Sequence, residues 1–303
     1  MELLYWFERV RVPILNEFML LITRFGEETA FLILALVMFW CIDKRKGYFI
    51  LSVGFVGTLT SQFLKLSCRV LRPWVLDKNF TILEQAREAA SGYSFPSGHS
   101  QSAVGTFGAT ACVIRNKYIR WCSVAIAILV PISRMYIGVH TPWDVLVGAA
   151  ISVILIFSLK PVVLSEKRGY FPVLLGIMTM LAVGYTCFVE FYVFPADVDT
   201  ENLASGIKNA YTLLGALLGF LVVYTVDEKW LKFSTKAVWW AQILKVCLGL
   251  LLVLAVKSGL KEALNFLFGE NVGRAVRYFL IVVVAGIFWP LSFKWFAKLG
   301  CRE

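Results

Sequence analysis

The chain has 303 residues, of which 59% are hydrophobic and 17% charged, and its mean hydropathy is +0.73. Soluble globular proteins carry about 25% charged residues, and the apolar excess here lies in repeated long runs, as a bilayer requires. The formal net charge of +10 is divided into short clusters between these runs, a pattern set by membrane topology rather than by nucleic-acid binding. The composition therefore excludes a soluble domain and predicts a polytopic membrane protein.

Taken in chain order, the sequence predicts an all-α fold with about nine transmembrane helices and an N-terminal interfacial helix. Residues 2–24 alternate aromatic and aliphatic side chains with charged ones and are interrupted by Pro13, which is typical of an amphipathic helix or helix pair. The predicted division is an interfacial segment (1–25), a part with every distinctive polar residue (26–160) and further transmembrane helices (161–303). The expected spans are 26–42, 48–66, 99–115, 119–137, 143–159, 170–193, 207–226, 237–256 and 275–293.

Lysine and arginine residues are concentrated in every second predicted loop. Cytoplasmic loops carry such an excess, so these loops are predicted to be cytoplasmic and the others extracytoplasmic. The second set holds the acidic residues Asp197, Asp199 and Glu201, the segment 67–98 and the turn around His140. We therefore expect a multi-pass protein of the plasma or inner membrane with its polar cluster on the extracytoplasmic side. The basic set consists of Lys44, Arg45, Lys46, Arg115, Lys117, Arg120, Lys160, Lys167, Arg168, Lys229, Lys232, Lys236, Lys294, Lys298 and Arg302.

The chain contains only two histidines, and His99 lies at the start of the third expected span. Ser97, Gly98 and His99 are predicted to open a helix, where free backbone N–H groups and the helix dipole favour an anion. Gly98 would allow phosphate oxygens to approach the backbone closely.

His140 lies in the turn between the fourth and fifth expected spans. Thr141 and Pro142 are typical of an N-cap and a first helical residue, so Asp144 falls in the first turn, within reach of the imidazole. A carboxylate that accepts one ring N–H leaves the other nitrogen free to attack. Asp144 has an alternative role, because with Thr141 it would also complete a capping box.

Three cations accompany the histidines at the span ends. Lys65 and Arg72 are two helical turns apart, and Arg134 precedes His140 by six residues. Taken singly, the first two could extend towards the interface and Arg134 could bind lipid headgroups. Together on one predicted face with both histidines, they indicate a phosphate-binding site, although this pattern does not choose between His99 and His140 as nucleophile.

Three motifs in this order resemble the signature of the type 2 phosphatidic acid phosphatase (PAP2) superfamily, which includes glucose-6-phosphatases and vanadium haloperoxidases. The resemblance covers roughly residues 26–160, which would form a PAP2-like catalytic membrane core, and is uninformative about residues 161–303. The motifs are Lys65-x6-Arg72-Pro73, Pro96-Ser97-Gly98-His99 and Ser133-Arg134-x5-His140-x3-Asp144.

The resemblance implies a role for each matching residue. His140 would be the nucleophile that forms a phosphohistidine, Asp144 would orient it, and His99 would act first as general acid and then as base. Neither a metal nor another cofactor is expected. The substrate phosphate would be held by Lys65, Arg72, Ser97, Gly98 and Arg134.

The expected activity is hydrolysis of a lipid phosphate or prenyl pyrophosphate, with the bilayer and the lipid substrate as partners and no nucleic acid. Three alternatives keep the same pocket: a sugar-phosphate phosphatase, a lipid phosphotransferase, and a non-catalytic lipid transporter or binding protein. The sequence specifies no oligomeric state.

Overall fold

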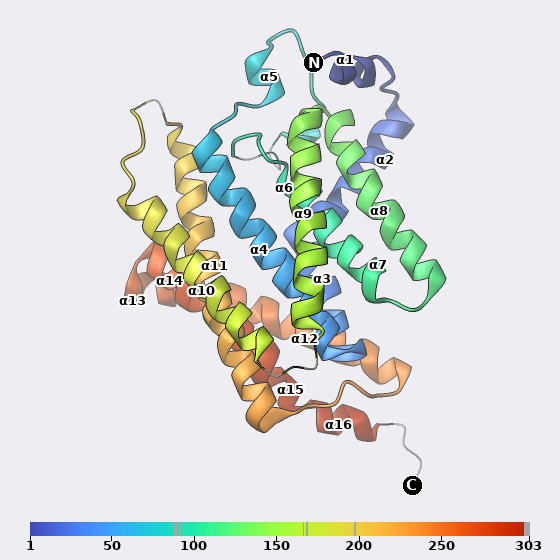
Figure 1. The fold of residues 1–303 in the computed structure, drawn as a ribbon, viewed down its shortest axis with the longest axis vertical. Helices are drawn as coiled ribbons and strands as arrows, with labels where there is room; N and C mark the ends of the chain where they lie inside the picture. Colours follow the sequence, from blue (N-terminus) through green and yellow to red (C-terminus); the bar gives the residue numbers. More distant parts are fainter. Residues whose placement is uncertain (88–89, 91, 166, 168, 197, 300–303) are drawn as a thin grey trace. The chain divides into compact units, whose positions relative to one another are not determined.

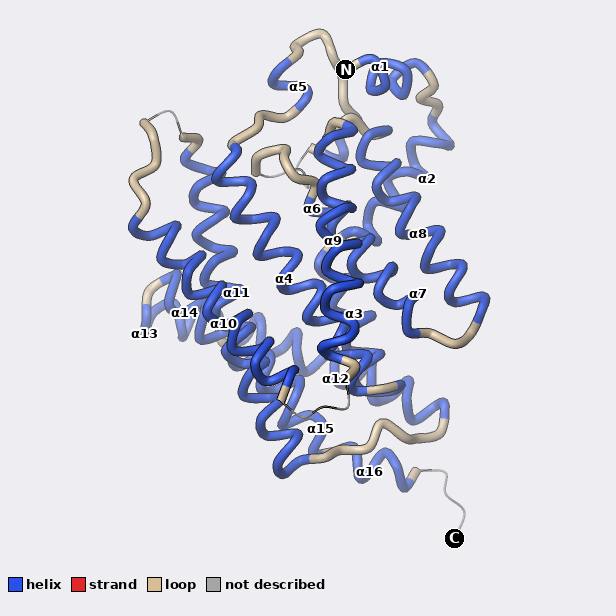
Figure 2. Tube along the Cα trace, in the orientation of Figure 1, coloured by secondary structure: helices blue, strands red, loops and turns tan. Residues whose placement is uncertain are grey.

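The computed structural model describes residues 1–87, 90, 92–165, 167, 169–196 and 198–299, so Arg168, Asp197 and Arg302 lie outside the described residues. Within this part of the chain every regular element is a helix, which confirms the all-α expectation (Figures 1 and 2). The α-helices are α1 (Glu2–Arg9), α2 (Pro13–Thr23), α3 (Glu28–Val37), α4 (Lys44–Cys68), α5 (Pro73–Leu76), α6 (Gly98–Ala103), α7 (Ala109–Val113), α8 (Lys117–Tyr136), α9 (Pro142–Val163), α10 (Tyr170–Phe191), α11 (Thr200–Val226), α12 (Trp239–Gly259), α13 (Lys261–Phe268), α14 (Glu270–Val283), α15 (Trp289–Leu291) and α16 (Phe293–Lys298). Shorter 3-10 or π-helical turns are η1 (Arg24–Gly26), η2 (Met38–Ile42), η3 (Glu84–Ala86), η4 (Val104–Gly108), η5 (Asp227–Leu231) and η6 (Val284–Phe288).

The described chain contains 7 helical segments that are long and apolar enough to cross a membrane, and up to 8 if a bent pair counts as one span. That pair, Pro13–Gly26 and Glu28–Ile42, is bent by 56°. The chain is thus a multi-pass membrane protein. The segments are Lys44–Leu76, Lys117–Tyr136, Pro142–Val163, Tyr170–Phe191, Thr200–Leu231, Trp239–Phe268 and Glu270–Lys298.

Two expected spans have no counterpart among these seven segments: residues 26–42, which fall in the bent pair, and residues 99–115. Residues 98–113 are helical as α6, η4 and α7. This run is shorter than the ~20 residues that a straight helix needs to cross the hydrocarbon core. By length and composition the described residues give seven or eight candidate crossings, and the expected count of nine stays a prediction.

Two compact units divide the chain. Unit 1 comprises Met1–Leu34, Phe49–Pro161 and Val193–Gly206, and unit 2 comprises Ala35–Tyr48, Val162–Tyr192 and Ile207–Glu303. All residues that were expected to form the site belong to unit 1. The division of the sequence at residues 25 and 160 stays a prediction.

The N-terminal segment forms the expected helix pair and packs within unit 1. Val12 is extended and Pro13 begins α2, so the break falls at the proline. Arg11 donates from Nε and Nη2 to the carbonyl oxygen of Tyr136 at 3.1 and 3.0 Å, and the Tyr136 hydroxyl donates to Asn16 Oδ1 at 2.7 Å. These bonds attach the segment to the end of α8.

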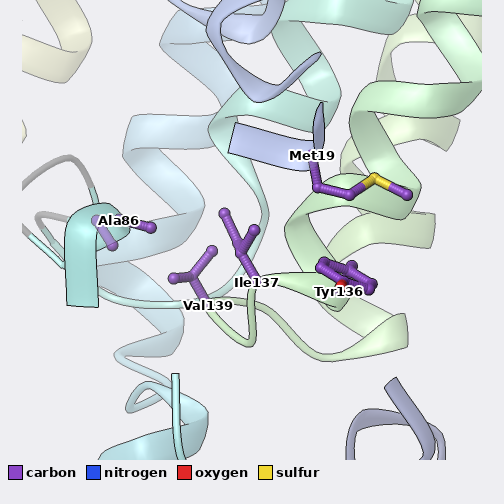
Figure 3. Packing of buried hydrophobic residues seen from close by; sticks show 6 residues of the cluster. Met19, Ala86, Tyr136, Ile137 and Val139 are labelled. Atoms are coloured by element: carbon purple, nitrogen blue, oxygen red, sulfur yellow. The ribbon is translucent and has the colours of Figure 1, made fainter. Parts of the chain in front are cut away.

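A hydrophobic cluster in unit 1 fixes the chain just before His140 (Figure 3). After α8 ends at Tyr136, Gly138 adopts a φ of +87°, a left-handed conformation that glycine reaches without strain. The buried residues on both sides of this glycine hold the turn that presents His140. The cluster consists of Met19, Ala86, Ala90, Tyr136, Ile137 and Val139.

Unit 2 has a separate aromatic and ionic core. The rings of Phe171 and Tyr224 meet edge to face with centroids 4.8 Å apart. Asp227 is buried, lies 2.9 Å from Lys44 Nζ, and accepts a hydrogen bond of 3.2 Å from the Tyr48 hydroxyl. Pairing and hydrogen bonding compensate the desolvation of this carboxylate.

Gly148 lets α9 approach the start of α6 in unit 1. A Cβ atom added at this position would lie 2.6 Å from the carbonyl oxygen of Ser97 and 3.4 Å from the amide nitrogen of Gln101. Because both contacts are to backbone, they cannot be relieved by a side-chain rotation, and the two helices would have to separate.

Gly148→Ala is therefore expected to destabilise the protein by about 1–3 kcal/mol, the usual cost of overpacking. The matched control is Gly184→Ala in α10, where an added Cβ meets nothing within 4 Å, and alanine also has the higher helix propensity. Thermal unfolding of the purified proteins, followed by circular dichroism in the same detergent, measures both changes. Equal melting temperatures for the two variants would contradict the close packing.

Candidate active site

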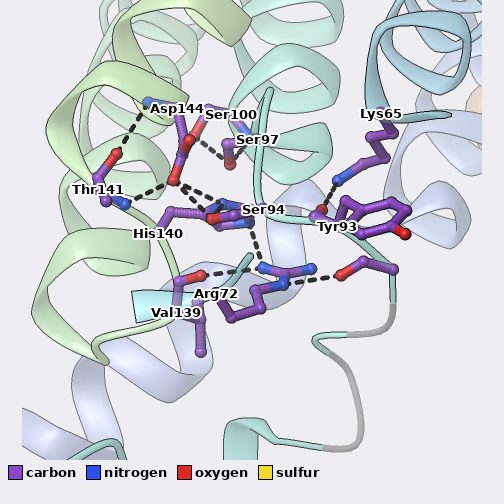
Figure 4. A network of polar contacts seen from close by, with 11 residues as sticks. Lys65, Arg72, Tyr93, Ser94, Ser97, Ser100, Val139, His140, Thr141 and Asp144 are labelled. Atoms are coloured by element: carbon purple, nitrogen blue, oxygen red, sulfur yellow. Dashed lines mark hydrogen bonds and ion pairs between the residues drawn. The ribbon is translucent and has the colours of Figure 1, made fainter. Parts of the chain in front are cut away.

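The predicted site residues come from four parts of unit 1, and most of their side chains converge in Figure 4. Lys65 lies in the last turn of α4, Arg72 precedes α5, and Asp144 lies in the first turn of α9. His140 occupies the turn before α9, and Arg134 lies in the last turn of α8; both are only 1% exposed. Groups far apart in the sequence are thus buried in one region.

Arg72 contacts the Nε2 nitrogen of the His140 ring. Its Nη1 lies 2.9 Å from His140 Nε2 and also donates to the Val139 carbonyl at 2.9 Å, while its Nε donates to the Gly92 carbonyl at 3.0 Å. A guanidinium has donors only, so Nε2 must be the acceptor and the proton of the neutral ring is assigned to Nδ1.

The Asp144 carboxylate accepts two hydrogen bonds and lies next to the His140 ring and the Ser94 hydroxyl. Its Oδ2 accepts from the Ser94 hydroxyl at 2.6 Å and from the Thr141 amide at 2.7 Å. The direct distance from Oδ2 to His140 Nδ1 is 3.6 Å, whereas Ser94 Oγ lies 3.4 Å from the same nitrogen. Ser94 Oγ therefore contacts both groups and lies beside the direct contact between the imidazole and the carboxylate.

The capping box that competed with this contact in the sequence is also present. The Asp144 amide donates to Thr141 Oγ1 at 3.3 Å, and α9 begins at Pro142 as expected. One carboxylate oxygen thus caps the helix and faces the histidine network at the same time. The two interpretations of Asp144 are compatible.

Backbone and hydroxyl oxygens hold the other two cations. Lys65 Nζ donates to the Tyr93 carbonyl at 2.5 Å, and Arg134 Nη1 donates to Thr23 Oγ1 at 2.8 Å. By contrast, Arg134 Nε and His99 Nε2 are buried atoms without a hydrogen-bond partner among the described residues.

The start of α6 has the predicted form. Ser97 is the N-cap, and its Oγ accepts from the amide and the hydroxyl of Ser100 at 3.4 and 2.9 Å. The Ser97 amide donates to the backbone oxygen of Asp144 at 2.9 Å, which fixes α6 to α9. A Cβ at Gly98 would meet nothing within 4 Å, so there is room for a ligand beside this backbone.

The electrostatic environment keeps His140 neutral. Burial is the largest cause that holds its pKa well below 6.5, and the nearby charges of Arg72, Arg134 and Lys65 lower the pKa further. A neutral imidazole has the lone pair that a nucleophile needs. Within the described part of the chain, no group of three or more His, Cys, Asp or Glu side chains is arranged to hold a metal ion.

Sequence reasoning missed the tripeptide that connects these groups. Gly92 and Tyr93 contribute carbonyl oxygens to Arg72 and Lys65, and Ser94 contributes its hydroxyl to Asp144. The Tyr93 hydroxyl in turn accepts a hydrogen bond of 3.2 Å from the backbone amide of Asp199. The tripeptide lies in an irregular segment without periodicity, so no signal in the sequence marks it.

Comparison with family models and with known proteins identifies relatives of this chain. Residues 45–168 match the PAP2 superfamily model, and residues 211–302 match the model described as PAP2 superfamily phosphatase, transmembrane extension. Phosphatidylglycerophosphatase B of Bacillus subtilis is 32% identical over 164 residues, which cover 50% of this chain and 76% of that protein. Undecaprenyl-diphosphatase BcrC of the same species is 29% identical over 48% of this chain and 72% of its own. Undecaprenyl-diphosphatase of Sulfolobus acidocaldarius is 27% identical over 46% of this chain and 66% of its own. No solved structure matches the chain. From the family match and the extent of the first relative, we conclude that this chain belongs to the PAP2 superfamily of phosphatases.

Proposed function

We propose that this membrane phosphatase hydrolyses a lipid phosphate or a prenyl pyrophosphate through a phosphohistidine at His140. The observation that carries the proposal is the pairing of a buried, neutral His140 with three buried cations and an unpartnered His99 Nε2. Similar proteins named as phosphatidylglycerophosphatase and undecaprenyl-diphosphatase support the substrate class.

Substrate binding begins with an exchange of partners. The phosphate replaces His140 Nε2 as a partner of Arg72, and it takes the place of the Tyr93 carbonyl at Lys65. Arg134 Nε and the Gly98 backbone offer further donors to the phosphate oxygens. The bonds that are replaced run from the same cations to neutral acceptors, whereas the phosphate oxygens are charged, so the exchange gains a direct attraction between opposite charges.

Two displacements at phosphorus complete the reaction. The Nε2 lone pair of His140 attacks phosphorus, the bond to the leaving oxygen breaks, and His99 donates a proton to that oxygen. Burial and the charges of Arg134, Arg72 and Lys65 hold the pKa of His99 well below 6.5, so the bound phosphate dianion must raise this pKa before His99 can act as the acid. The now neutral His99 then takes a proton from water, whose oxygen attacks phosphorus and breaks the P–N bond. The three cations stabilise the charge that develops on the phosphoryl oxygens in both steps.

Replacing each histidine separates the two roles. His140→Ala is expected to abolish turnover and covalent labelling, because the attacking nitrogen is lost. His99→Ala is expected to slow turnover by about 10²–10⁴-fold, the usual contribution of a general acid. With a good leaving group the phosphoenzyme should then accumulate, and acid-labile radioactive phosphate on the quenched protein measures it. Acid-labile label on the His140→Ala protein would exclude His140 as the nucleophile.

Ser94 acts as a positioning residue for His140, since its hydroxyl contacts both Nδ1 of His140 and Oδ2 of Asp144. Ser94→Ala is expected to lower kcat about tenfold, the scale of one lost hydrogen bond in a buried site. Ser94→Thr retains the hydroxyl and should recover most of the activity. A buried serine of α8, Ser123, provides the matched control, because Ser123→Ala leaves this network intact.

The pH profile distinguishes positioning from a general loss of structure. Since the pKa of His140 lies below 6.5, kcat/KM of the wild type should keep its plateau to below pH 6.5 on the acid side. Without the Ser94 hydroxyl, Asp144 Oδ2 loses one hydrogen-bond donor, so the carboxylate interacts more strongly with the imidazole and favours its protonated form. The acid limb of Ser94→Ala should therefore move to higher pH, and an unchanged limb would refute the positioning role.

The finer topology is part of this proposal. We infer about nine crossings, residues 1–25 in the interface and the catalytic groups on the extracytoplasmic side. The exposure of Trp6, Ile14 and Leu21 along α1 and α2 supports an interfacial position for the N-terminal segment. Single cysteines introduced at Lys78 and Lys117, in a background without native cysteines, test this orientation with a membrane-impermeant thiol reagent in intact cells. Only the cysteine at position 78 is expected to react. Reaction at position 117 alone would show that the orientation is the opposite one.

The substrate class follows from the position of the site at helix ends. A lipid can reach this depth laterally with its chain in the bilayer, so selectivity depends on headgroup fit and local concentration. We expect phosphatidic acid, a sphingoid phosphate or a prenyl pyrophosphate to exceed glucose 6-phosphate in kcat/KM by at least about tenfold, or about 1.4 kcal/mol.

Phosphate release in mixed micelles at fixed surface concentration gives this comparison without a bias from partitioning. Equal turnover of glucose 6-phosphate would favour the sugar-phosphate alternative. Phosphate passed to an added lipid alcohol instead of water would identify a phosphotransferase, and binding without release would identify a lipid-binding protein.

A further inference from the structure

A second group of charged side chains lies in unit 2, on the first two turns of α14. Glu270, Arg274 and Arg277 follow one another at helical spacing and therefore share a face of the helix. Gly273 belongs to the same face and lies against α13, because an added Cβ would be 2.6 Å from the Leu264 carbonyl oxygen. The charged face is thus turned towards a neighbouring helix, and α13 and α14 lie side by side in Figure 1.

Positive charge predominates in this group. Glu270 Oε1 lies 3.7 Å from Lys208 Nζ in α11 and 3.6 Å from Arg274 Nη2, so one carboxylate is shared by two cations. Arg277 adds a third cation that has no ion pair among the described residues. With three cations and one carboxylate, two positive charges remain uncompensated.

Arg277 is the most unusual member of the group. Its side chain is buried, with 5% of the residue exposed, and its Nε has no hydrogen-bond partner in the part of the chain that the structure describes. Arg274 Nε is a second buried atom without a partner. Arginines near the ends of membrane helices usually extend their charge into water, which the burial of Arg277 precludes. A buried guanidinium without an anion is costly, and at membrane depth such groups generally mark a binding site.

Apolar side chains next to the group identify the kind of anion. Phe266, Leu267 and Phe268 at the end of α13 are exposed, as is Val272 in the first turn of α14. These side chains lie at the end of the helix pair where α14 begins, one to two helical turns from Arg274 and Arg277, and offer a surface for an acyl chain. Guanidinium groups bind phosphate oxygens in bidentate fashion, which an ammonium cannot do.

We propose that Arg274 and Arg277, together with Lys208, bind the phosphate of an anionic phospholipid whose acyl chains lie against the end of α13. Arg274 is partly exposed and provides the entrance, whereas buried Arg277 forms the floor of the site. None of these residues belongs to the catalytic group in unit 1. The inference is therefore independent of the reaction proposed above and assigns a lipid-binding role to the transmembrane extension.

The test uses the full-length, delipidated protein in a nonionic detergent. Dioleoyl phosphatidylglycerol is a suitable probe, because its phosphodiester is not a substrate of a phosphomonoesterase. Native mass spectrometry and the rise in melting temperature give its affinity, since a ligand that binds the folded state stabilises it. Dioleoyl phosphatidylcholine and inorganic phosphate, titrated separately, distinguish an anionic lipid from any lipid and from free phosphate.

The double variant Arg274→Gln/Arg277→Gln is expected to bind phosphatidylglycerol at least about tenfold more weakly than the wild type. The matched control Lys294→Gln removes an exposed charge of α16, outside the α13–α14 pair, and should leave the affinity unchanged. Hydrolysis of p-nitrophenyl phosphate should be equal in all three proteins, which shows that the catalytic site is intact.

Three results would overturn the proposal. These are undiminished affinity in the double variant, equal binding of phosphatidylcholine, and full stabilisation by inorganic phosphate alone. If the double variant does not fold, Lys208→Gln decides the question, because this half-exposed ammonium can be removed without leaving a buried gap. A loss of affinity of about threefold or more is then expected, and no change refutes the site.

Discussion

Three cations buried around one histidine, with Asp144 as the buried carboxylate beside them, form the constraint on which unit 1 depends. Like charges in a region of low dielectric repel one another, and the repulsion falls only when an anion or well-oriented dipoles face them. The dipoles that face Arg72 and Lys65 are the carbonyl groups of Gly92, Tyr93 and Val139. Carbonyls satisfy the donors without neutralising the charge, so the fold keeps an electrostatic preference for a phosphate dianion.

The surrounding helices hold these donors in fixed positions. The Ser97 amide bonded to the Asp144 backbone, and the absence of a side chain at Gly148, bring the starts of α6 and α9 together. The hydrophobic cluster before His140 fixes the turn after α8, which carries His140 into the site. Donors that are oriented before the reaction need no reorganisation when charge develops, which is the main source of electrostatic catalysis.

Residue chemistry explains which parts of this site the sequence predicts. His99, His140 and the cations are conspicuous because ionisable groups at membrane depth are rare and costly. Ser94 and Tyr93 act through a hydroxyl and a backbone carbonyl in an irregular segment, where neither periodicity nor charge distinguishes them. The helix from Gly98 was also expected, and its observed range of 98–113 is close to the expected 99–115. It ends at Val113 because Ile114 is extended and Asn116 caps the next helix, accepting from the Tyr118 and Ile119 amides.

The bond between the Tyr93 hydroxyl and the Asp199 amide bears on how this protein is built from parts. Residues 193–206 comprise the connection after α10 and the first turns of α11. They lie outside the stretch that matches the PAP2 superfamily model, yet they belong to unit 1 with the catalytic groups. Gly206 also lies directly against Leu66, next to the phosphate-binding lysine. The family boundary in the sequence and the physical boundary of the catalytic unit therefore differ. A chimera that exchanges the extension would preserve the catalytic unit only if residues 193–206 stayed with the catalytic part, and a junction placed at the end of α9 would separate Tyr93 from its partner.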